Sequence, residues 1–258
     1  MRRLHLGLAI VALSVLGFAN ASFADGWGNI KGQVVWGSKT VPAAEKVNVN
    51  KDEQHCLSKG PILNDILVID KDTGGVANVA IWLVPVTKGD KMPIHPDLKA
   101  VPKDTKIIDQ PCCMFVPRVT MMREGQTLII KNPAPVPHNS RLSGKVNGTK
   151  NPNLPPGGQI GFSGDTKLKA EERAMLLNCD IHGWMGGRVY VFDHPYFALT
   201  GKDGTFEIKN APGGKYKIYI QHEAGGWVHK GKTSAGQVID IPAGKTLDLG
   251  KYEMKIED

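Results

Sequence analysis

The sequence lacks the motifs of the common hydrolases and nucleotide-binding enzymes. It contains no G-x-S-x-G, no H-E-x-x-H, no P-loop and no G-x-G-x-x-G. Its lysines are scattered and are not interleaved with aromatic residues, which gives nucleic-acid binding little support. Beyond residue 19, no stretch is apolar enough to span a bilayer. We therefore expect neither nucleic-acid binding nor stable membrane insertion of the mature chain.

The N-terminus has the three parts of a secretory signal peptide. Arg2-Arg3 precede an apolar run over residues 4–19, and small residues follow at Ala21 and Ala24. The run is shorter than the roughly 20 residues that a membrane anchor needs. We expect cleavage after Ala21 or Ala24 and a periplasmic or secreted protein. Removal of residues 1–24 from the 258 leaves 234 residues and lowers the net charge from +7 to about +5, which suits an acidic redox partner or an anionic envelope.

The rest of the chain has the pattern of an all-β protein. Alternating apolar residues predict strands over residues 29–36, 62–70, 76–85, 106–109, 115–122, 126–132 and 188–192. The strand ending at Pro85 is apolar on both faces, so we expect burial on both sides. Residues 133–160 are rich in proline, asparagine and glycine and predict a long loop, which is uncommon unless it carries function. Residues 168–177 fit either a short helix or a strand.

Soft metal ligands are concentrated in one short segment. Cys179, His182 and Met185 are spaced three residues apart, and His138 supplies a second imidazole 41 residues before Cys179. A cysteine and two histidines with a weak axial methionine are the ligands of type 1 (blue) copper electron-transfer sites. The pattern therefore predicts one copper ion held by these four residues. The structural alternative is a buried thiol, a core imidazole and a core methionine.

The segment Cys179-x-x-His182-x-x-Met185-Gly-Gly-x-Val, with His138-Asn139 upstream, resembles the cupredoxins, and its short loop is most like that of the amicyanins. The resemblance implies a Greek-key β-sandwich and a carrier of single electrons rather than an enzyme. Its redox partner would be a dehydrogenase, a cytochrome or a copper oxidase. It also implies that Asn139, outside the ligand set, ties the two ligand loops together.

The C-terminal part resembles a different family. Residues 197–210 read as two strands about an Asp203-Gly204 turn, and residues 212–220 as another strand. The pattern T-x-x-D-G-x-F-x-I-x-N-x-P-x-G-x-Y resembles carboxypeptidase-regulatory-like (transthyretin-like) β-sandwiches. Bacterial methylamine-utilisation-type secreted proteins join such a sandwich to a copper-type domain, and residues 109–118 and 192–197 resemble theirs. We expect residues 27–95 and 196–258 to form this sandwich, with the cupredoxin domain, residues 105–193, inserted. The alternative is two consecutive domains, with the N-terminal strands completing the cupredoxin.

The four cysteines are Cys56, Cys112, Cys113 and Cys179. An exported protein meets an oxidising compartment, where cysteines usually pair. If Cys179 binds metal, three remain and one is left over. The resemblance favours a Cys56–Cys113 disulfide with Cys112 extra, while a strained vicinal bond between Cys112 and Cys113 stays open.

The remaining histidines lack ligand spacing. His194 is expected to order the linker after the last cupredoxin strand. The others are expected to face solvent: His55, His95, His222 and His229. Three rival functions stay open: copper storage or delivery, a metal-free envelope binding module, and a mononuclear copper enzyme. The enzyme would need an open coordination position, which Met185 would close.

Overall fold

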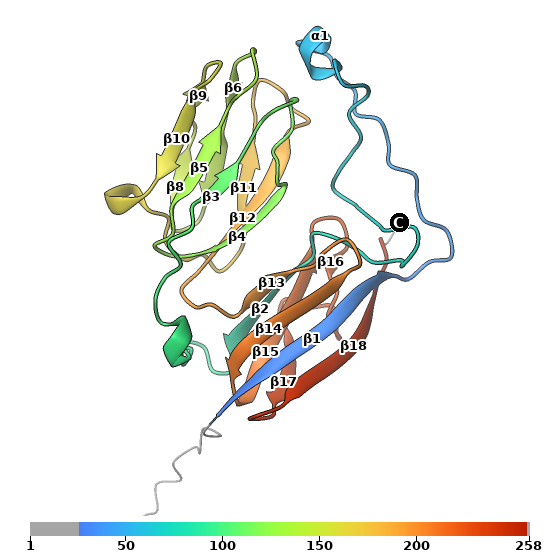
Figure 1. The fold of residues 1–258 in the computed structure, drawn as a ribbon. Coiled ribbons are helices and arrows are strands. Elements are labelled where there is room, and N and C mark those ends of the chain that lie inside the picture. Colours follow the sequence, from blue (N-terminus) through green and yellow to red (C-terminus); the bar gives the residue numbers. More distant parts are fainter. Residues whose placement is uncertain (1–25, 257–258) are drawn as a thin grey trace, which may run out of the picture.

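The computed structural model describes residues 26–256, so the expected signal peptide lies outside the described residues. Within them, strands predominate and the one α-helix is the single turn α1 (Glu53–Cys56). No helix in residues 26–256 is long and apolar enough to cross a membrane. Figure 1 shows two β-rich bodies, one above the other. The all-β class predicted from the sequence is confirmed.

The lower body, here called the base sandwich, takes strands from both ends of the chain (Figure 1). One sheet has the order β14-β1-β18, and the other has the order β13-β2-β15-β16 with β17 also paired to β15. The strands are β1 (Trp27–Trp36), β2 (Ala80–Pro85), β13 (Phe197–Leu199), β14 (Thr205–Pro212), β15 (Gly214–His222), β16 (Gly226–Trp227), β17 (Gln237–Ile241) and β18 (Thr246–Met254). Alternate residues of these strands point inward and form one hydrophobic core.

The upper body, here called the inserted sandwich, is built from residues 106–192 between β2 and β13. Its sheets have the orders β10-β5-β3 and β4-β12-β11-β7-β8, and β6 pairs with β9. The strands are β3 (Lys106–Ile108), β4 (Val119–Arg123), β5 (Leu128–Lys131), β6 (His138–Asn139), β7 (Arg141–Gly144), β8 (Gly148–Lys150), β9 (Asn153–Leu154), β10 (Gln159–Phe162), β11 (Met175–Asn178) and β12 (Gly186–Phe192). Two short 3₁₀ turns lie at Pro96–Leu98 and Gly164–Thr166.

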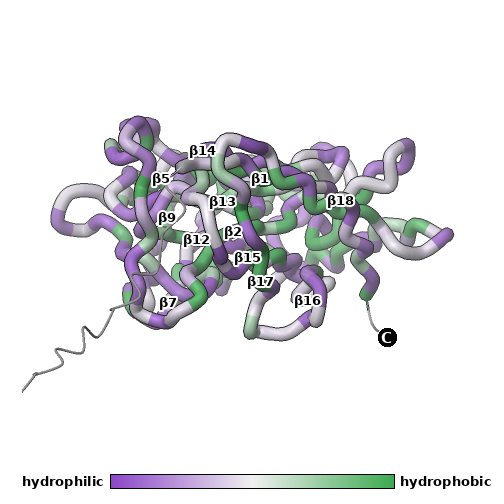
Figure 2. The backbone as a smooth tube through the Cα atoms, turned by 90° about the horizontal axis from the view of Figure 1, so that it is seen from below, coloured by the Kyte–Doolittle hydropathy of each residue, from purple (hydrophilic) through white to green (hydrophobic). Residues whose placement is uncertain are grey.

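Strand β2 joins the two bodies because it is buried on both faces, as the sequence predicted. Ile81 and Leu83 enter the base core, whereas Trp82 packs between the sandwiches. The Trp82 ring stacks on Tyr219 and contacts Tyr190 of β12, with centroids 5.2 and 5.8 Å apart. Figure 2 shows the hydrophobic stretches in the interior and hydrophilic loops at the periphery.

The long connection between β1 and β2 climbs along the inserted sandwich and carries α1 (Figure 1). We call residues 47–62 the strap, because Val49, Cys56 and Ile62 are buried in the core of the inserted sandwich. Farther along, Leu67 and Ile69 pack on the base core instead. The strap thus packs on the inserted sandwich, while the chain on both sides of it leads to the base sandwich.

Several predicted elements differ from the observed ones. The strand expected over residues 62–70 is wrong, because its apolar residues divide between two cores and form only isolated bridges at Leu63 and Ile69. The strand expected to begin at residue 115 begins at Val119. Residues 133–160 contain four short strands, β6 to β9, rather than one loop. Of the ambiguous residues 168–177, only those from Met175 onward form regular structure, and it is a strand.

Candidate metal centre

The loop that carries three of the predicted ligands is a tight connection between β11 and β12. These strands pair antiparallel, with Asn178 opposite Gly186, so residues 179–185 turn at the end of the sheet. The turn is closed by two backbone hydrogen bonds. The Met185 N–H donates to the His182 carbonyl at 2.9 Å, and the Cys179 N–H donates to the Met185 carbonyl at 3.3 Å.

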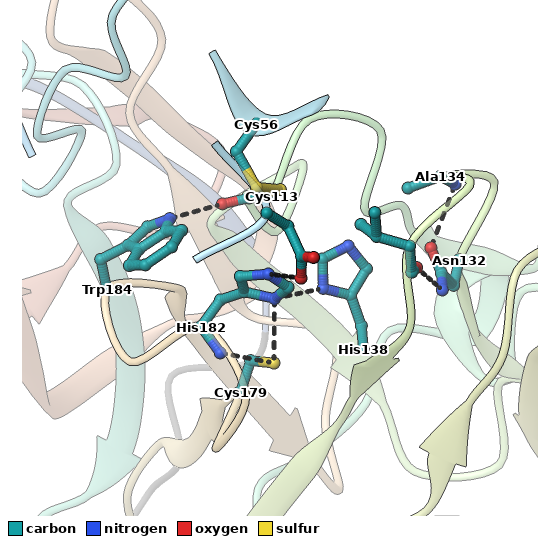
Figure 3. The surroundings of a disulfide bond; sticks show 10 residues. Cys56, Cys113, Asn132, Ala134, His138, Cys179, His182 and Trp184 are labelled. Carbon is teal, nitrogen blue, oxygen red and sulfur yellow. Dashed lines mark hydrogen bonds and ion pairs between the residues drawn. A yellow bond between two sulfur atoms is a disulfide. The ribbon is translucent and has the colours of Figure 1, made fainter. Parts of the chain in front are cut away.

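His138 reaches the same point from β6, which pairs with β9 rather than with the sheet of the loop. Its Nδ1 lies 3.0 Å from Nδ1 of His182, and the Cys179 Sγ lies 4.0 Å from that same His182 atom. Figure 3 shows the two rings and the sulfur converging beside the Cys56–Cys113 disulfide. One donor atom from each of the three residues lies within 4.8 Å of the others, and all three side chains are buried.

These three residues fit a soft transition metal. A thiolate with two imidazoles suits copper, and neutral imidazole is the form that coordinates. Burial, reinforced by the nearby His182, lowers the pKa of His138 to about 4. Burial also lowers the pKa of His182, although Asp52 opposes the shift. Both rings are therefore neutral at pH 7, and His138 leaves its buried Nε2 without a partner in the protein.

Asn139 links the two ligand segments. Its Oδ1 accepts the backbone N–H of Asp180 at 2.7 Å and that of Ile181 at 3.2 Å, and it lies 3.2 Å from the Cys179 Sγ. Its Nδ2 donates to Asp180 Oδ2 at 3.1 Å. The residue after one ligand thus holds the loop that carries the others.

Met185 is buried in the core of the inserted sandwich, on the same loop as Cys179 and His182. It also borders a cavity of about 310 Å³ that runs between the strap and β12. Trp184, Phe115 and Arg118 line the same cavity. Met185 therefore lies on the same loop as Cys179 and His182, and one side of it faces this cavity.

Arg118, at the edge of that cavity, connects three parts of the fold. Its guanidinium donates to both oxygens of Glu223 at 2.9 Å and to Asp65 Oδ1. Glu223 follows β15 of the base sandwich, and Asp65 lies just beyond the strap. Burial raises the pKa of Glu223, but hydrogen bonding and charge from Arg118 outweigh it, so the net pKa is lowered. The group is a buried charge network rather than a ligand set.

The strap covers the loop of residues 179–185, which carries three of the predicted ligands and is here called the ligand loop. Asp52 Oδ2 lies 2.9 Å from Nε2 of His182, whose side chain is fully buried. The Trp184 ring packs on the His182 ring with centroids 5.1 Å apart, and its Nε1–H donates to the Cys113 carbonyl at 3.1 Å. Trp184 is half-buried and packs against the core of the inserted sandwich.

The structure joins Cys56 to Cys113, while Cys112 and Cys179 are free thiols. Both disulfide sulfurs lie within 4.8 Å of a His182 ring nitrogen, but as a disulfide they offer no thiolate to a metal. Cys112 is half-buried and Cys179 is buried, so the two free thiols differ in their access to solvent.

Two histidines expected to face solvent are buried, so that expectation is wrong. His222 Nδ1 accepts the N–H groups of Ala224 and Gly225, and burial lowers its pKa to about 4. His229 packs its ring near those of Tyr219 and Trp227. His222 lies at the turn between β15 and β16, where it is paired with Gly226. His95 is also largely covered, because its backbone N–H donates to the Tyr196 hydroxyl and its ring contacts Trp27.

The two other histidines differ from these. His55 is half-buried in α1, with its Nε2 buried and without a partner. His194 is buried after β12, and its Nδ1 accepts the Tyr196 N–H at 3.1 Å. That bond orders the turn into β13, as expected from the sequence.

No protein-family model matches the chain, and no curated protein matches it. Among solved structures, a purple cupredoxin from Nitrosopumilus maritimus is 22% identical, with a TM-score of 0.27, over 33% of this chain and 98% of that one. A reduced amicyanin mutant is 17% identical, with a TM-score of 0.30, over 43% of this chain and 97% of that one. A Cu-containing nitrite reductase from Thermus scotoductus SA-01 is 19% identical, with a TM-score of 0.30, over 42% of this chain but only 25% of the reductase.

Sequence reasoning missed two features of this region, Asp52 and the Arg118 network. Asp52 is 130 residues from His182 in the chain and matches no ligand motif. The expected pairing of Cys56 was the one available signal, because it brings the neighbourhood of Asp52 to the loop before β4. For Arg118 there was no signal, since its partners lie in separate segments.

Proposed function

We propose that this protein is an exported type 1 copper protein that carries single electrons between redox partners of the envelope. The observation that carries the proposal is the convergence of His138, Cys179 and His182, buried and with donor atoms within 4.8 Å of one another. Met185 would complete the set as a weak axial ligand. Copper bound by these residues would accept and release one electron. Residues 105–193 would be the cupredoxin domain and the base sandwich its carboxypeptidase-regulatory-like support.

The surrounding residues suit a centre that changes oxidation state with little movement. The backbone N–H of His182 donates to the Cys179 Sγ at 3.4 Å, which helps to hold the sulfur in place. Asn139 fixes the loop through the Asp180 and Ile181 amides. A site held by backbone bonds on two strands limits rearrangement of the ligands, and a small rearrangement favours rapid electron transfer.

The disulfide supports an oxidising compartment, and hence the periplasmic or secreted location proposed from the sequence. The redox partner would be a dehydrogenase, a cytochrome or a copper oxidase. A net charge of about +5 on the mature chain favours an acidic docking surface on that partner. In this proposal the protein is a carrier and not an enzyme.

The test is the visible spectrum of the mature protein loaded with Cu(II), beside its Cys179→Ser variant. We expect an intense thiolate-to-copper band in the wild type that reductant bleaches and oxidant restores through many cycles, and no such band in the variant. Cys112→Ser is the matched control and should keep the band, because Cys112 is a free thiol outside the cluster. A wild type without stoichiometric copper, or without the band, would rule out the proposal.

Replacing Asn139 by alanine should weaken copper binding by about 10- to 100-fold, the usual cost of losing an outer hydrogen-bond partner. The physical reason is that Asp180 and Ile181 lose the acceptor that holds the ligand loop. Competition with a chelator of known affinity measures the change. The control is Asn153→Ala on β9, an exposed residue opposite Asn139 in the strand pair. Equal affinities for the two variants would contradict this role of Asn139.

The cavity beside Met185 favours a mononuclear copper enzyme as second candidate, because a small molecule could approach from that side. Adding azide to the Cu(II) protein separates the two functions. A carrier closed by Met185 should keep its spectrum unchanged at millimolar azide. New charge-transfer bands on azide addition would show an open coordination position and favour the enzyme.

A further inference from the structure

A carboxylate lies directly behind one of the proposed ligands. Asp52 Oδ2 is 2.9 Å from Nε2 of His182, and it comes from the strap rather than from the sandwich that carries the ligands. We propose that Asp52 is a positioning residue for His182, which sets the tautomer of that ring and lowers the reduction potential of the copper bound there. This inference rests on the proposed function.

The hydrogen bond determines which nitrogen of His182 is free. An ionised carboxylate only accepts, so the ring must carry its proton on Nε2 to donate to Asp52. The lone pair is then on Nδ1, the atom that lies 3.0 Å from Nδ1 of His138 and 4.0 Å from the Cys179 sulfur. The ring is therefore prepared for coordination through Nδ1 before any metal arrives.

Asp52 is held in place from several directions. It precedes α1 in a left-handed conformation, φ 50°, which aspartate tolerates better than most residues. Its carbonyl accepts the N–H groups of His55 and Cys56 at 3.0 and 2.9 Å. Cys56 is bonded to Cys113, whose carbonyl accepts the indole N–H of Trp184 on the ligand loop. Hydrogen bonds thus connect both Asp52 and the loop of His182 to the Cys56–Cys113 disulfide.

The charge has an electronic consequence for a metal on Nδ1. A carboxylate that accepts from the far nitrogen of a ligating histidine makes that ring a stronger donor. Stronger donation stabilises Cu(II) more than Cu(I), so the potential falls. Because His182 is fully buried, solvent screens this effect only from the Asp52 side. Loss of the charge should change the ratio of the Cu(I) and Cu(II) affinities roughly tenfold. For one electron, this raises the potential by about 59 mV.

Three variants test the proposal. Asp52→Asn keeps an oxygen that can accept from Nε2 but loses the charge, and Asp52→Ala loses both. Glu53→Gln is the matched control, because Glu53 is an exposed carboxylate on the adjacent residue of α1 and its replacement changes the net charge equally. Two measurements apply to each protein: the midpoint potential with copper, and the ¹⁵N chemical shifts of the His182 ring in the metal-free protein.

We expect Asp52→Asn and Asp52→Ala to raise the midpoint potential by about 59 mV, which corresponds to a tenfold change in the ratio of the Cu(I) and Cu(II) affinities. Glu53→Gln should leave the potential unchanged. In the metal-free protein, the ¹⁵N shifts should report one tautomer, protonated on Nε2, in the wild type and a mixture in Asp52→Ala. Equal potentials for Asp52→Asn and Glu53→Gln, or an unchanged tautomer in Asp52→Ala, would overturn the inference. Failure of the wild type to bind copper would instead rule out the proposed function. The effect of Asp52 on the tautomer could still be tested, because it is measured in the metal-free protein.

Discussion

Replacing Cys56 and Cys113 together by serine is expected to lower the free energy of unfolding by about 4 kcal/mol. The bond closes a loop of 57 residues, and a cross-link of that span removes about this much chain entropy from the unfolded state. Such a loss is a large part of the roughly 5–15 kcal/mol by which most domains are stable. Denaturant unfolding of the oxidised wild type and the double variant, with equal slopes, measures the change.

The same double variant should release the strap locally. The backbone bonds at its ends join the strap to itself and to its flanking residues: the Val47 N–H donates to the Ile62 carbonyl at 2.9 Å, and the Asn64 N–H donates to the Glu45 carbonyl at 2.8 Å. Besides the disulfide, its anchors on the inserted sandwich are side chains buried in that core and the contact of Asp52 with His182. We therefore expect faster amide hydrogen exchange over residues 47–62 than elsewhere in the variant.

Cys112→Ser is the control for this experiment, because it removes a neighbouring thiol without breaking the bond. It should leave both the free energy of unfolding and the exchange of the strap within error of wild type. A double variant as stable as the control would contradict the prediction and would mean that packing alone holds the strap on the ligand loop.

Local patterns in the sequence were sufficient for the fold class and for strands such as β1, β2 and β12, because alternation with a period of two reports burial on one face. Strand β2 is the clearest case: apolar residues on both faces predicted burial on both sides, and the structure places the strand between two cores. The same pattern misled over residues 62–70, whose apolar residues face two different bodies in succession. Periodicity shows that a residue is buried but not against what.

The candidate site divides in a similar way. Cys179, His182 and Met185 were found because a tight loop requires ligands close in sequence, and spacing records that. His138 arrives on another strand and was a candidate only because the ligand set calls for a second imidazole. Asp52 belongs to a segment whose position depends on a disulfide and on packing between separate parts of the chain. Contacts of that kind leave no periodic signal.

Arg118 shows most directly what such distant contacts contribute. Replacing it by methionine, which has similar length and no charge, is expected to cost about 3–5 kcal/mol, the usual result of removing one partner from a buried ion pair. Arg118 is almost completely buried, and Glu223 would retain only the half-buried Arg188, 3.3 Å away. Chemical denaturation at pH 7 measures the loss. Arg141→Met is the control; its pair with Asp180 is half-exposed, so it should cost at most about 1 kcal/mol.

The loss in Arg118→Met should depend on pH and on Glu223. In the wild type, the lowered pKa of Glu223 means that the pair stabilises fully above pH 4.5 and less as the pH falls through the folded-state value. In the variant, burial raises the pKa of Glu223, so acid neutralises this carboxyl and the gap to wild type narrows. Adding Glu223→Gln to Arg118→Met should likewise recover part of the stability, because no buried charge is then left unpaired. If the double variant were less stable than Arg118→Met at pH 7, the cost would come from lost packing between the strap and the sandwiches and not from the charge.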